Sequence, residues 1–285
     1  MTLNDWAIFF TDNARRPAGY RQALLIDGEE YGFRWIPAGE FEMGSPESEE
    51  DRYDDETLHH VILTKGFWLL ETPVTQRLYH SVVGTNPSRF SPAWDLASQF
   101  GEFDSFDALL TRSMEIEIEM EMNLITSDLP VETVSYDEAL EFCEELTKLL
   151  PKGLKATLPT EAQWEYACRA GTKTAYWYGN TANWYFMNYY DYIIEKTTPV
   201  KCYVPNAWGL YDMHGNVWEW CLDRYDDYPS GTVTDPVGPN GGWGRVCRGG
   251  SWGDSAQFCR SALRYGGEPD YRISNLGFRV LLVCD

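Results

Sequence analysis

Helix signals are confined to three short segments of this 285-residue chain, and their scarcity constrains the fold more than any other feature. The clearest segment starts at Ser135, which can form a capping box with Glu138. Apolar residues then recur at helical spacing as far as Leu150. Pro151 follows and cannot continue a helix. The sequence therefore predicts a core helix directly after Ser135.

Two shorter segments carry signals of the same kind. Thr160 can form a capping box with Gln163, and Gly171 supplies a left-handed stop. Residues 75–83 form the other segment, which ends at Gly84. The sequence predicts a helix in each of them.

The remaining sequence is rich in Gly, Pro, Trp and Tyr and contains only short β-like runs, such as residues 33–36 and 277–283. This mixture predicts an irregular α+β fold with abundant loops. Because 44% of the residues are hydrophobic and 15% are aromatic, the chain can bury a sizeable core. We expect one domain that spans residues 1–285.

Net charge and cysteine spacing exclude several classes of partner. The formal net charge of −21 repels phosphate backbones and anionic lipid, so no nucleic-acid partner is expected. No apolar stretch reaches the roughly 18 residues of a membrane helix, and the first residues lack a secretory pattern. We therefore expect a soluble chain without direct membrane insertion. The seven cysteines are widely spaced, which favours buried thiols over a disulfide framework or a metal knuckle.

Residues 114–122 alternate strictly between Met or Ile and Glu. A strand there would place the apolar side chains on one face and four glutamates on the other. Regularly placed glutamates also discourage pairing between sheet edges. The sequence predicts a solvated edge strand within an acidic insertion at residues 95–128.

Seven sequence blocks follow one another in a fixed order after an N-terminal extension of residues 1–32. They read WIPAGEFEMG (35–44), ETPVT (71–75), PVETVSY (130–136), LPTEAQWEYA (158–167), GLYDMHGNVWEW (209–220), RGGSW (248–252) and LGFR (276–279). These blocks resemble the formylglycine-generating-enzyme family, also called the sulfatase-modifying domain. The resemblance implies a C-type-lectin-like fold. One fold can carry enzymes and pure binding proteins, so activity has to be argued from the site.

The resemblance also allows the enzymatic interpretation to be tested. Aerobic members of the family have two cysteines after the Gly-Gly-Ser-aromatic block, and this pair binds copper. The same spacing places Cys259 at the second position but Asp254 at the first. Because Cu(I) requires soft thiolate ligands, a carboxylate cannot replace the missing cysteine. We expect no catalytic residues, no enzyme activity and no cofactor.

Other metal sites of the wider family are poorly matched. The iron-dependent sulfoxide synthases need three histidines, whereas the four here (His59, His60, His80 and His214) lack metal spacing. We interpret His59 and His60 as an exposed polar pair, His214 as a turn residue and Cys259 as a packed thiol.

A structural calcium site remains an alternative. The resemblance would build it from Asp212, Glu219 and the carbonyls of Gly215 and Val217, and oxygen ligands suit calcium. Glu219 could equally be a hydrogen-bonded core acid, and the tract between Asn183 and Val204 does not supply the family's other calcium ligands. We assign no metal site.

The C-terminal region, residues 248–283, alternates fixed family residues with positions that look free to vary. The twelve candidate ligand-binding positions are Gly253, Asp254, Ser255, Phe258, Leu263, Tyr265, Gly266, Gly267, Tyr271, Ile273, Ser274 and Asn275. This pattern resembles the variable region of diversity-generating-retroelement proteins, most closely the Treponema variable protein. The intervening Trp252, Arg260, Arg264, Pro269, Arg272, Phe278 and Arg279 would then be scaffold, with the arginines ion-paired beneath the surface.

Residue usage at these positions supports the resemblance. In such systems, copying errors at template adenines turn asparagine codons into codons ending in C or T. Those codons cannot encode Lys, Glu, Gln, Met or Trp, and none of the five occupies the twelve positions. Avoidance by chance would occur roughly one time in fifteen if these types fill about a fifth of ordinary positions.

The sequence therefore predicts a non-catalytic display protein that binds variable macromolecular ligands, in particular proteins, through one solvent-facing patch. Aromatic side chains offer broad contact at low entropy cost, and Ser, Asp and Asn adapt their hydrogen bonds. We expect display on a bacterial cell surface through an anchor outside this sequence. The alternative is a formylglycine-generating-enzyme-like oxidase or sulfatase-maturation enzyme.

Overall fold

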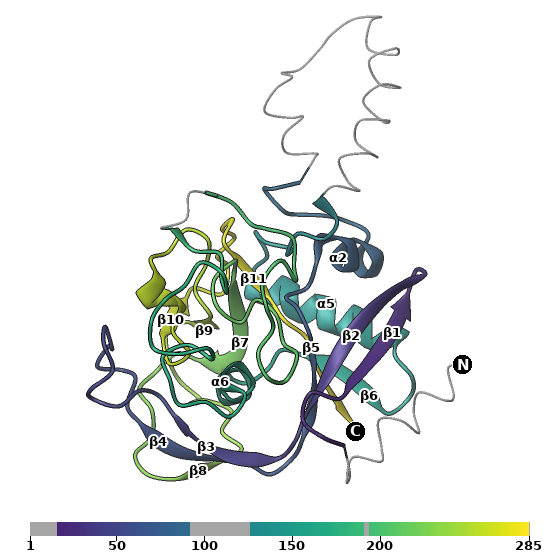
Figure 1. Cartoon of the computed structure of the whole chain (residues 1–285). Coiled ribbons are helices and arrows are strands. Elements are labelled where there is room, and N and C mark those ends of the chain that lie inside the picture. Colours follow the sequence, from purple (N-terminus) through teal and green to yellow (C-terminus); the bar gives the residue numbers. More distant parts are fainter. Residues whose placement is uncertain (1–15, 92–125, 191–193, 285) are drawn as a thin grey trace, which may run out of the picture.

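Three small β-sheets organise the chain in the computed structural model, which describes residues 16–91, 126–190 and 194–284 (Figure 1). The largest has the strand order β1-β2-β5-β12-β6, and its paired neighbours run antiparallel. Its strands are β1 (Arg21–Ile26), β2 (Glu29–Ile36), β5 (Phe67–Leu70), β12 (Leu281–Cys284) and β6 (Leu154–Thr157). The β-like run at residues 33–36 is thus confirmed as the end of β2.

The other two sheets are smaller. The four-stranded sheet has the order β10-β9-β7-β11, and the three-stranded sheet has the order β3-β4-β8. Their strands are β10 (Arg264–Gly267), β9 (Arg245–Arg248), β7 (Trp218–Arg224), β11 (Leu276–Phe278), β3 (Gly39–Met43), β4 (His59–Leu63) and β8 (Val233–Thr234). Strand β10 pairs only with β9 among the described strands, so it forms one edge of its sheet.

All three predicted helices are confirmed. They are α2 (Gln76–Val83), α5 (Tyr136–Leu149) and α6 (Glu161–Arg169). The capping boxes at Ser135 and Thr160 are both formed. One detail differs, because α6 ends one residue early, at Ala170, whose φ of 46° is already left-handed. Gly171 continues in the same region with a φ of 93°.

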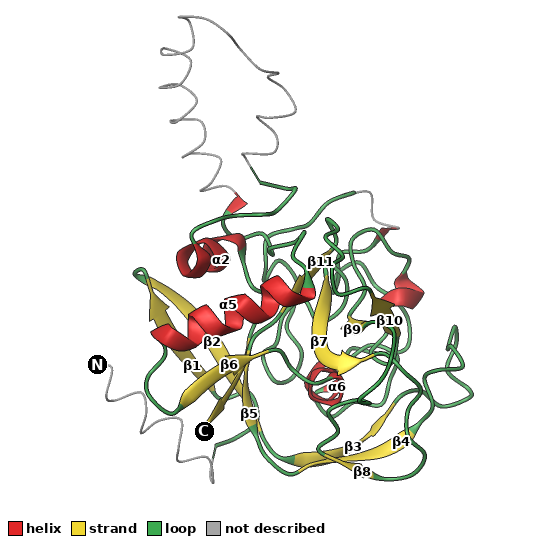
Figure 2. Cartoon of the chain, turned by 180° about the vertical axis from the view of Figure 1, so that it is seen from behind, coloured by secondary structure: helices red, strands yellow, loops and turns green. Residues whose placement is uncertain are grey.

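The main core lies between α5 and the five-stranded sheet, across which the helix runs (Figure 2). Helix α5 buries Ala139, Phe142, Cys143 and Leu146. The Phe142 ring packs edge-on against Phe278, with 5.1 Å between centroids. A second core surrounds α6 and contains Trp164, Phe67 and Leu69. Buried aromatic rings supply much of the stabilisation in such cores.

The predicted strand at residues 277–283 is wrong in one respect, because it is two strands. Strand β11 pairs with β7 in the four-stranded sheet, and β12 pairs with β5 and β6 in the five-stranded sheet. Arg279 lies at the break, fully buried, and donates to the carboxylate of Glu219 and the carbonyl of Leu70. A continuous apolar run cannot reveal that the chain changes sheets.

The cysteines, the lengths of the helices and the acidic insertion were also subjects of prediction. None of the seven cysteines forms a disulfide, and five of them are buried, as expected. Among the described residues, no helix has the length and apolar character needed to cross a membrane. The predicted edge strand at residues 114–122 lies outside the described residues.

Candidate ligand-binding surface

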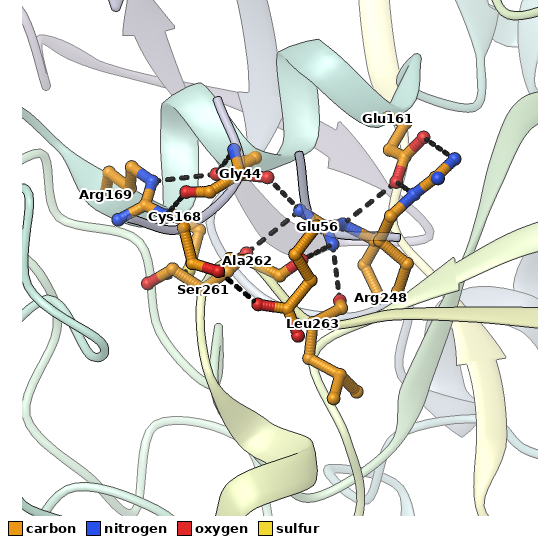
Figure 3. A network of polar contacts seen from close by, with 12 residues as sticks. Gly44, Glu56, Glu161, Cys168, Arg169, Arg248, Ser261, Ala262 and Leu263 are labelled. Atoms are coloured by element: carbon orange, nitrogen blue, oxygen red, sulfur yellow. Dashed lines mark hydrogen bonds and ion pairs between the residues drawn. The ribbon is translucent and has the colours of Figure 1, made fainter. Parts of the chain in front are cut away.

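Buried arginine–glutamate pairs hold the C-terminal segment in place. Arg248 is completely buried and contacts the Glu165 carboxylate. It also donates to the carbonyls of Ala262 and Leu263 (Figure 3). One guanidinium therefore closes the turn between η3 (Ala256–Cys259) and β10. A planar donor fork is suited to satisfying several oxygens at once.

Two further arginines connect this segment to distant parts of the chain. Arg260 donates to both oxygens of Glu56, at 2.6 and 2.8 Å, and to Glu49 at 2.7 Å. Arg264 makes a two-pronged pair with Glu161, at 2.6 and 2.9 Å. The prediction that Arg260, Arg264 and Arg279 are ion-paired beneath the surface is thus confirmed.

Residues from both ends of the segment meet at Ser251. Its hydroxyl contacts the Asp254 carboxylate and accepts a 2.9 Å hydrogen bond from the Asn275 side chain. Trp218 Nε1 also donates to Asp254 at 2.8 Å, and its ring lies 5.5 Å from that of Tyr265. Burial raises the pKa of Asp254, although the hydrogen bonds from Ser251 and Trp218 oppose this effect. Three of the predicted ligand-binding positions are therefore neighbours.

Nine of the twelve predicted positions are at least partly accessible, and we call them the display surface. They are Gly253, Asp254, Ser255, Phe258, Tyr265, Tyr271, Ile273, Ser274 and Asn275. Tyr265, Tyr271 and Ile273 are the most exposed large side chains among them, at 46%, 39% and 41%. Trp252 Nε1 donates to the Ser274 carbonyl and so fastens the two ends of the segment together.

Three predicted positions are not on the surface. Leu263 is 3% exposed and belongs to the main core. Gly266 and Gly267 are buried in β10, and a Cβ at Gly267 would lie 2.8 Å from the buried Trp220 ring. The expectation that all twelve positions face solvent was therefore wrong. Strand β10 explains part of the difference, because alternation places Gly266 on the face opposite Tyr265, whereas Gly267 shares the face of Tyr265 and is covered by Trp220.

The predicted scaffold residues also include exceptions. Arg272 is exposed, and its pair with Glu138 at 3.0 Å lies in solvent. Trp252 is only partly buried, against the ring of Phe90 at 5.6 Å. Phe278 is fully buried, as predicted.

Two residues that shape this surface could not be predicted from the sequence. Trp218 is buried under Asp254 and Tyr265. Tyr190 is 61% exposed, and its backbone N–H donates to the Asp254 carbonyl at 2.9 Å. Tyr190 therefore borders the display surface. No local signal indicates this, because Tyr190 is 64 residues from Asp254 in sequence.

The sequence matches a known protein family over most of its length. The profile of the sulfatase-modifying factor enzyme 1-like domain matches residues 28–283. The chain belongs to this family. The formylglycine-generating enzyme of Streptomyces coelicolor is 32% identical over 280 residues, covering 86% of this chain and 87% of that enzyme. The inactive C-alpha-formylglycine-generating enzyme 2 of Bos taurus is 27% identical over 295 residues, covering 90% and 89%.

Two solved structures have a similar fold over most of the chain. Treponema denticola variable protein 1 has a TM-score of 0.73 and 29% identity, covering 94% of this chain and 99% of that protein. PvdO from Pseudomonas aeruginosa has a TM-score of 0.70 at 24% identity, with 94% and 99% covered, and shares the fold. The predicted C-type-lectin-like fold of formylglycine-generating-enzyme type is thus confirmed, as is its link to variable proteins.

The copper chemistry of the sulfatase-modifying family does not fit the residues present. Cys259 is completely buried, and a Cβ at Gly250 would lie 2.5 Å from its sulfur. Asp254, which stands where the resemblance places the first cysteine, is engaged by Ser251 and Trp218. A buried thiol and a hydrogen-bonded carboxylate do not supply the two thiolates that Cu(I) requires.

The histidines differ from expectation. His59 is 7% exposed rather than a surface residue, and its ring lies 4.5 Å from that of Tyr228. His214 lies in a bend, as a turn residue would, but is fully buried between the carbonyl of Cys259 and the N–H of Trp177. Burial lowers the pKa of His214 to about 4. It is therefore a neutral core residue at ordinary pH.

The calcium site considered for this family is not matched at Glu219. Glu219 accepts hydrogen bonds from Arg279 and from Trp164 Nε1, so its carboxylate is already satisfied. Asp212 accepts from the Lys201 N–H through Oδ2, and burial raises its pKa to about 6. Glu219 is the hydrogen-bonded core acid that the sequence left open.

Proposed function

We propose that this protein is a non-catalytic display protein whose display surface, diversified by a retroelement, binds macromolecular ligands, in particular other proteins. The supporting observation is the separation of roles within residues 248–279. Accessible side chains lie on a segment whose backbone is held by Arg248, Arg260 and Arg264. Such a segment can change its exposed residues without changing its path.

The composition of the display surface favours a protein ligand. Tyr265, Tyr271, Phe258 and Ile273 offer large apolar contacts, and Asp254, Ser255, Ser274 and Asn275 offer hydrogen bonds. Antibody paratopes use the same combination of rigid aromatic and adaptable polar residues. Nucleic acid is disfavoured by the net charge of −21. Treponema denticola variable protein 1 shares the fold at 29% identity, which supports a variable surface here. Exposure on a bacterial cell surface belongs to the same proposal.

A combinatorial library tests whether the surface tolerates variation. The nine display positions are randomised together with codons that end in C or T, and the folded fraction is measured by protease resistance. Most members should remain folded, because surface substitutions usually change stability by less than about 0.5 kcal/mol. The control library randomises Leu263, Gly266 and Gly267, and most of its members should unfold. Equal losses in the two libraries would contradict the proposal.

Gene context tests the origin of the variation. A near-copy of the codons for residues 253–275 should lie near the gene, with AAC or AAT at the variable positions, beside a reverse transcriptase. The structure sharpens this expectation, since AAC or AAT is expected at the nine display positions but not necessarily at Leu263, Gly266 or Gly267. A neighbourhood without any such repeat would remove the retroelement from the proposal.

The alternative is a formylglycine-generating-enzyme-like oxidase, and the 32% identity to the Streptomyces coelicolor enzyme favours it. A Cu(I) titration distinguishes the two. The display protein should bind no stoichiometric copper that depends on Cys259. Copper binding that is abolished by Cys259→Ser, but retained in the exposed control Cys284→Ser, would establish the alternative.

A further inference from the structure

A cavity of about 470 Å³ lies between α6, the end of β7 and the segment at residues 226–239, which includes β8. None of the nine display residues lines it. Its floor is polar and buried, and consists of His59, Glu161, Asp223 and Arg264. Its rim is exposed and includes Asp226, Asp227, Val237 and Pro239. The volume falls in the range of small-molecule sites, about 300–1,000 Å³.

The cavity carries an excess of negative charge. Arg264 and Glu161 neutralise each other through two hydrogen bonds. Within the described part of the chain, no ion pair reaches Asp223, Asp226 or Asp227. The net charge of −21 adds to this local field. An anion would therefore be repelled, and a cation would be attracted.

His59 supplies a second, independent indication of a ligand. Its Nδ1 lies 2.8 Å from the Thr57 carbonyl, which can only accept, so Nδ1 carries the proton. In the neutral imidazole Nε2 is the acceptor, and no hydrogen bond joins it to any described residue. His59 as a whole is 7% exposed. Its Nε2 nevertheless keeps contact with solvent, because it is not one of the fully buried side-chain atoms that lack a hydrogen-bond partner. The ring lines the cavity, so this lone pair opens into it.

Asp223 completes the acceptor set on the floor. Its Oδ2 accepts a 2.8 Å hydrogen bond from the Glu161 N–H. Burial, followed by the charge of Glu161, raises the pKa of Asp223 to about 7. A cation would therefore meet an ionised carboxylate at moderately alkaline pH.

We propose that this cavity binds a small organic cation, a primary ammonium or amidinium group carried on an apolar body. The charged head would donate to Asp223 and to Nε2 of His59. The apolar body would lie against Val233, Pro236 and Val237, which line the outer part. A metal ion is a poorer fit, since among the described residues no group of three His, Cys, Asp or Glu side chains is placed to hold one.

The test uses benzamidinium as the probe, at about pH 8, where Asp223 is ionised. Benzyl alcohol and benzoate are its neutral and anionic counterparts. Isothermal titration calorimetry on the full chain should detect benzamidinium binding and no comparable binding of the other two. Asp223→Asn removes the charge but keeps an oxygen that can accept from Glu161 N–H. It should weaken the affinity at least tenfold.

A rim variant keeps the test decisive if Asp223→Asn fails to fold. Val237 is 71% exposed, so Val237→Trp should block the entrance without disturbing the buried floor. The matched control is Val204→Trp, at an exposed valine that does not line the cavity. Affinity lost in Val237→Trp and retained in Val204→Trp supports the site. No benzamidinium binding to the parent protein, or equal binding to all variants, overturns it.

Discussion

The display surface and the buried, ion-paired arginines that hold it, Arg248, Arg260 and Arg264, occupy the same stretch of sequence but depend on different interactions. We call these arginines and their carboxylate partners the anchors. Tyr265 and Tyr271 reach solvent, and their loss leaves no cavity in the core. Arg260, only a few residues away, is 2% exposed and bound to Glu49 and Glu56 from a loop more than 200 residues earlier. The fold is thus fixed by contacts that the exposed residues do not make. This independence is what a variable binding surface requires.

Burial makes the ion pairs of the anchors important for stability, and it also makes the loss of either partner costly. An arginine that is withdrawn from water needs nearly all of its donors satisfied. Arg260 meets that need at all three nitrogens, and Arg248 meets it at its two terminal nitrogens but not at Nε. If one partner of such a pair is removed, the other becomes an unpaired buried charge.

The largest effect is expected for Arg260→Met. The substitution leaves Glu56 and Glu49 without their cation, and breaking a buried pair costs about 3–5 kcal/mol. Urea denaturation measures the free energy of unfolding. The control is Arg272→Met, which breaks the exposed pair with Glu138 and should change the free energy of unfolding far less, because solvent screens that pair. Similar losses in both variants would show that burial does not separate anchor from surface.

A second test compares two aliphatic residues that the sequence placed in the same class. Leu263→Asn should destabilise by about 3 kcal/mol or more, because Leu263 is 3% exposed and an asparagine there would lack partners. Ile273→Asn should change stability by less than about 0.5 kcal/mol, because Ile273 is 41% exposed. Thermal unfolding of the two variants side by side gives the difference. A tolerated Leu263→Asn would return this position to the display surface.

Acid should weaken the anchors in a defined pH window. Burial alone would raise the pKa of Glu56, but the hydrogen bonds and charge of Arg260 outweigh it and lower the pKa. A carboxylate with a lowered folded-state pKa stabilises the protein fully above its unfolded pKa of about 4.3, and this contribution is lost as the pH falls through the folded-state pKa. Unfolding free energies measured between about pH 6 and pH 3 should therefore fall more steeply in the parent protein than in Glu56→Gln. Parallel curves would mean that this pair does not contribute to acid sensitivity.

Local signals predicted the helices well because each needed only neighbouring residues. The boxes at Ser135 and Thr160 are complete within three residues, and both formed. The break at Arg279 could not be predicted in this way, since its cause is a contact with Glu219, 60 residues earlier. The same limit hid the burial of His59, which depends on Tyr228.

The candidate site was predicted in part for a related reason. The alternation of fixed and free residues identified the segment, and nine of twelve positions are accessible. Alternation along β10 is visible only once the strand and its pairing with β9 are known. Gly267 is confined by Trp220, which lies 47 residues earlier. Residue types allowed by a codon argument carry no information about burial.

The smallest stability effect, and the sharpest contrast with binding, is expected at Tyr265 and Tyr271. Tyr265→Ala and Tyr271→Ala should each change the free energy of unfolding by about 0.5 kcal/mol or less. The Tyr265 ring packs against the Trp218 ring, with 5.5 Å between centroids. The destabilisation by Tyr265→Ala should therefore lie at the upper end of that range. Binding should show the reverse order, because exposed aromatic side chains dominate paratope contacts. The measurement pairs urea denaturation with affinity for a protein ligand selected against the parent surface, and Arg272→Met serves as the binding control. If both alanine variants unfolded as readily as Arg260→Met, the two tyrosines would belong to the anchors and the display surface would lose its most exposed contacts.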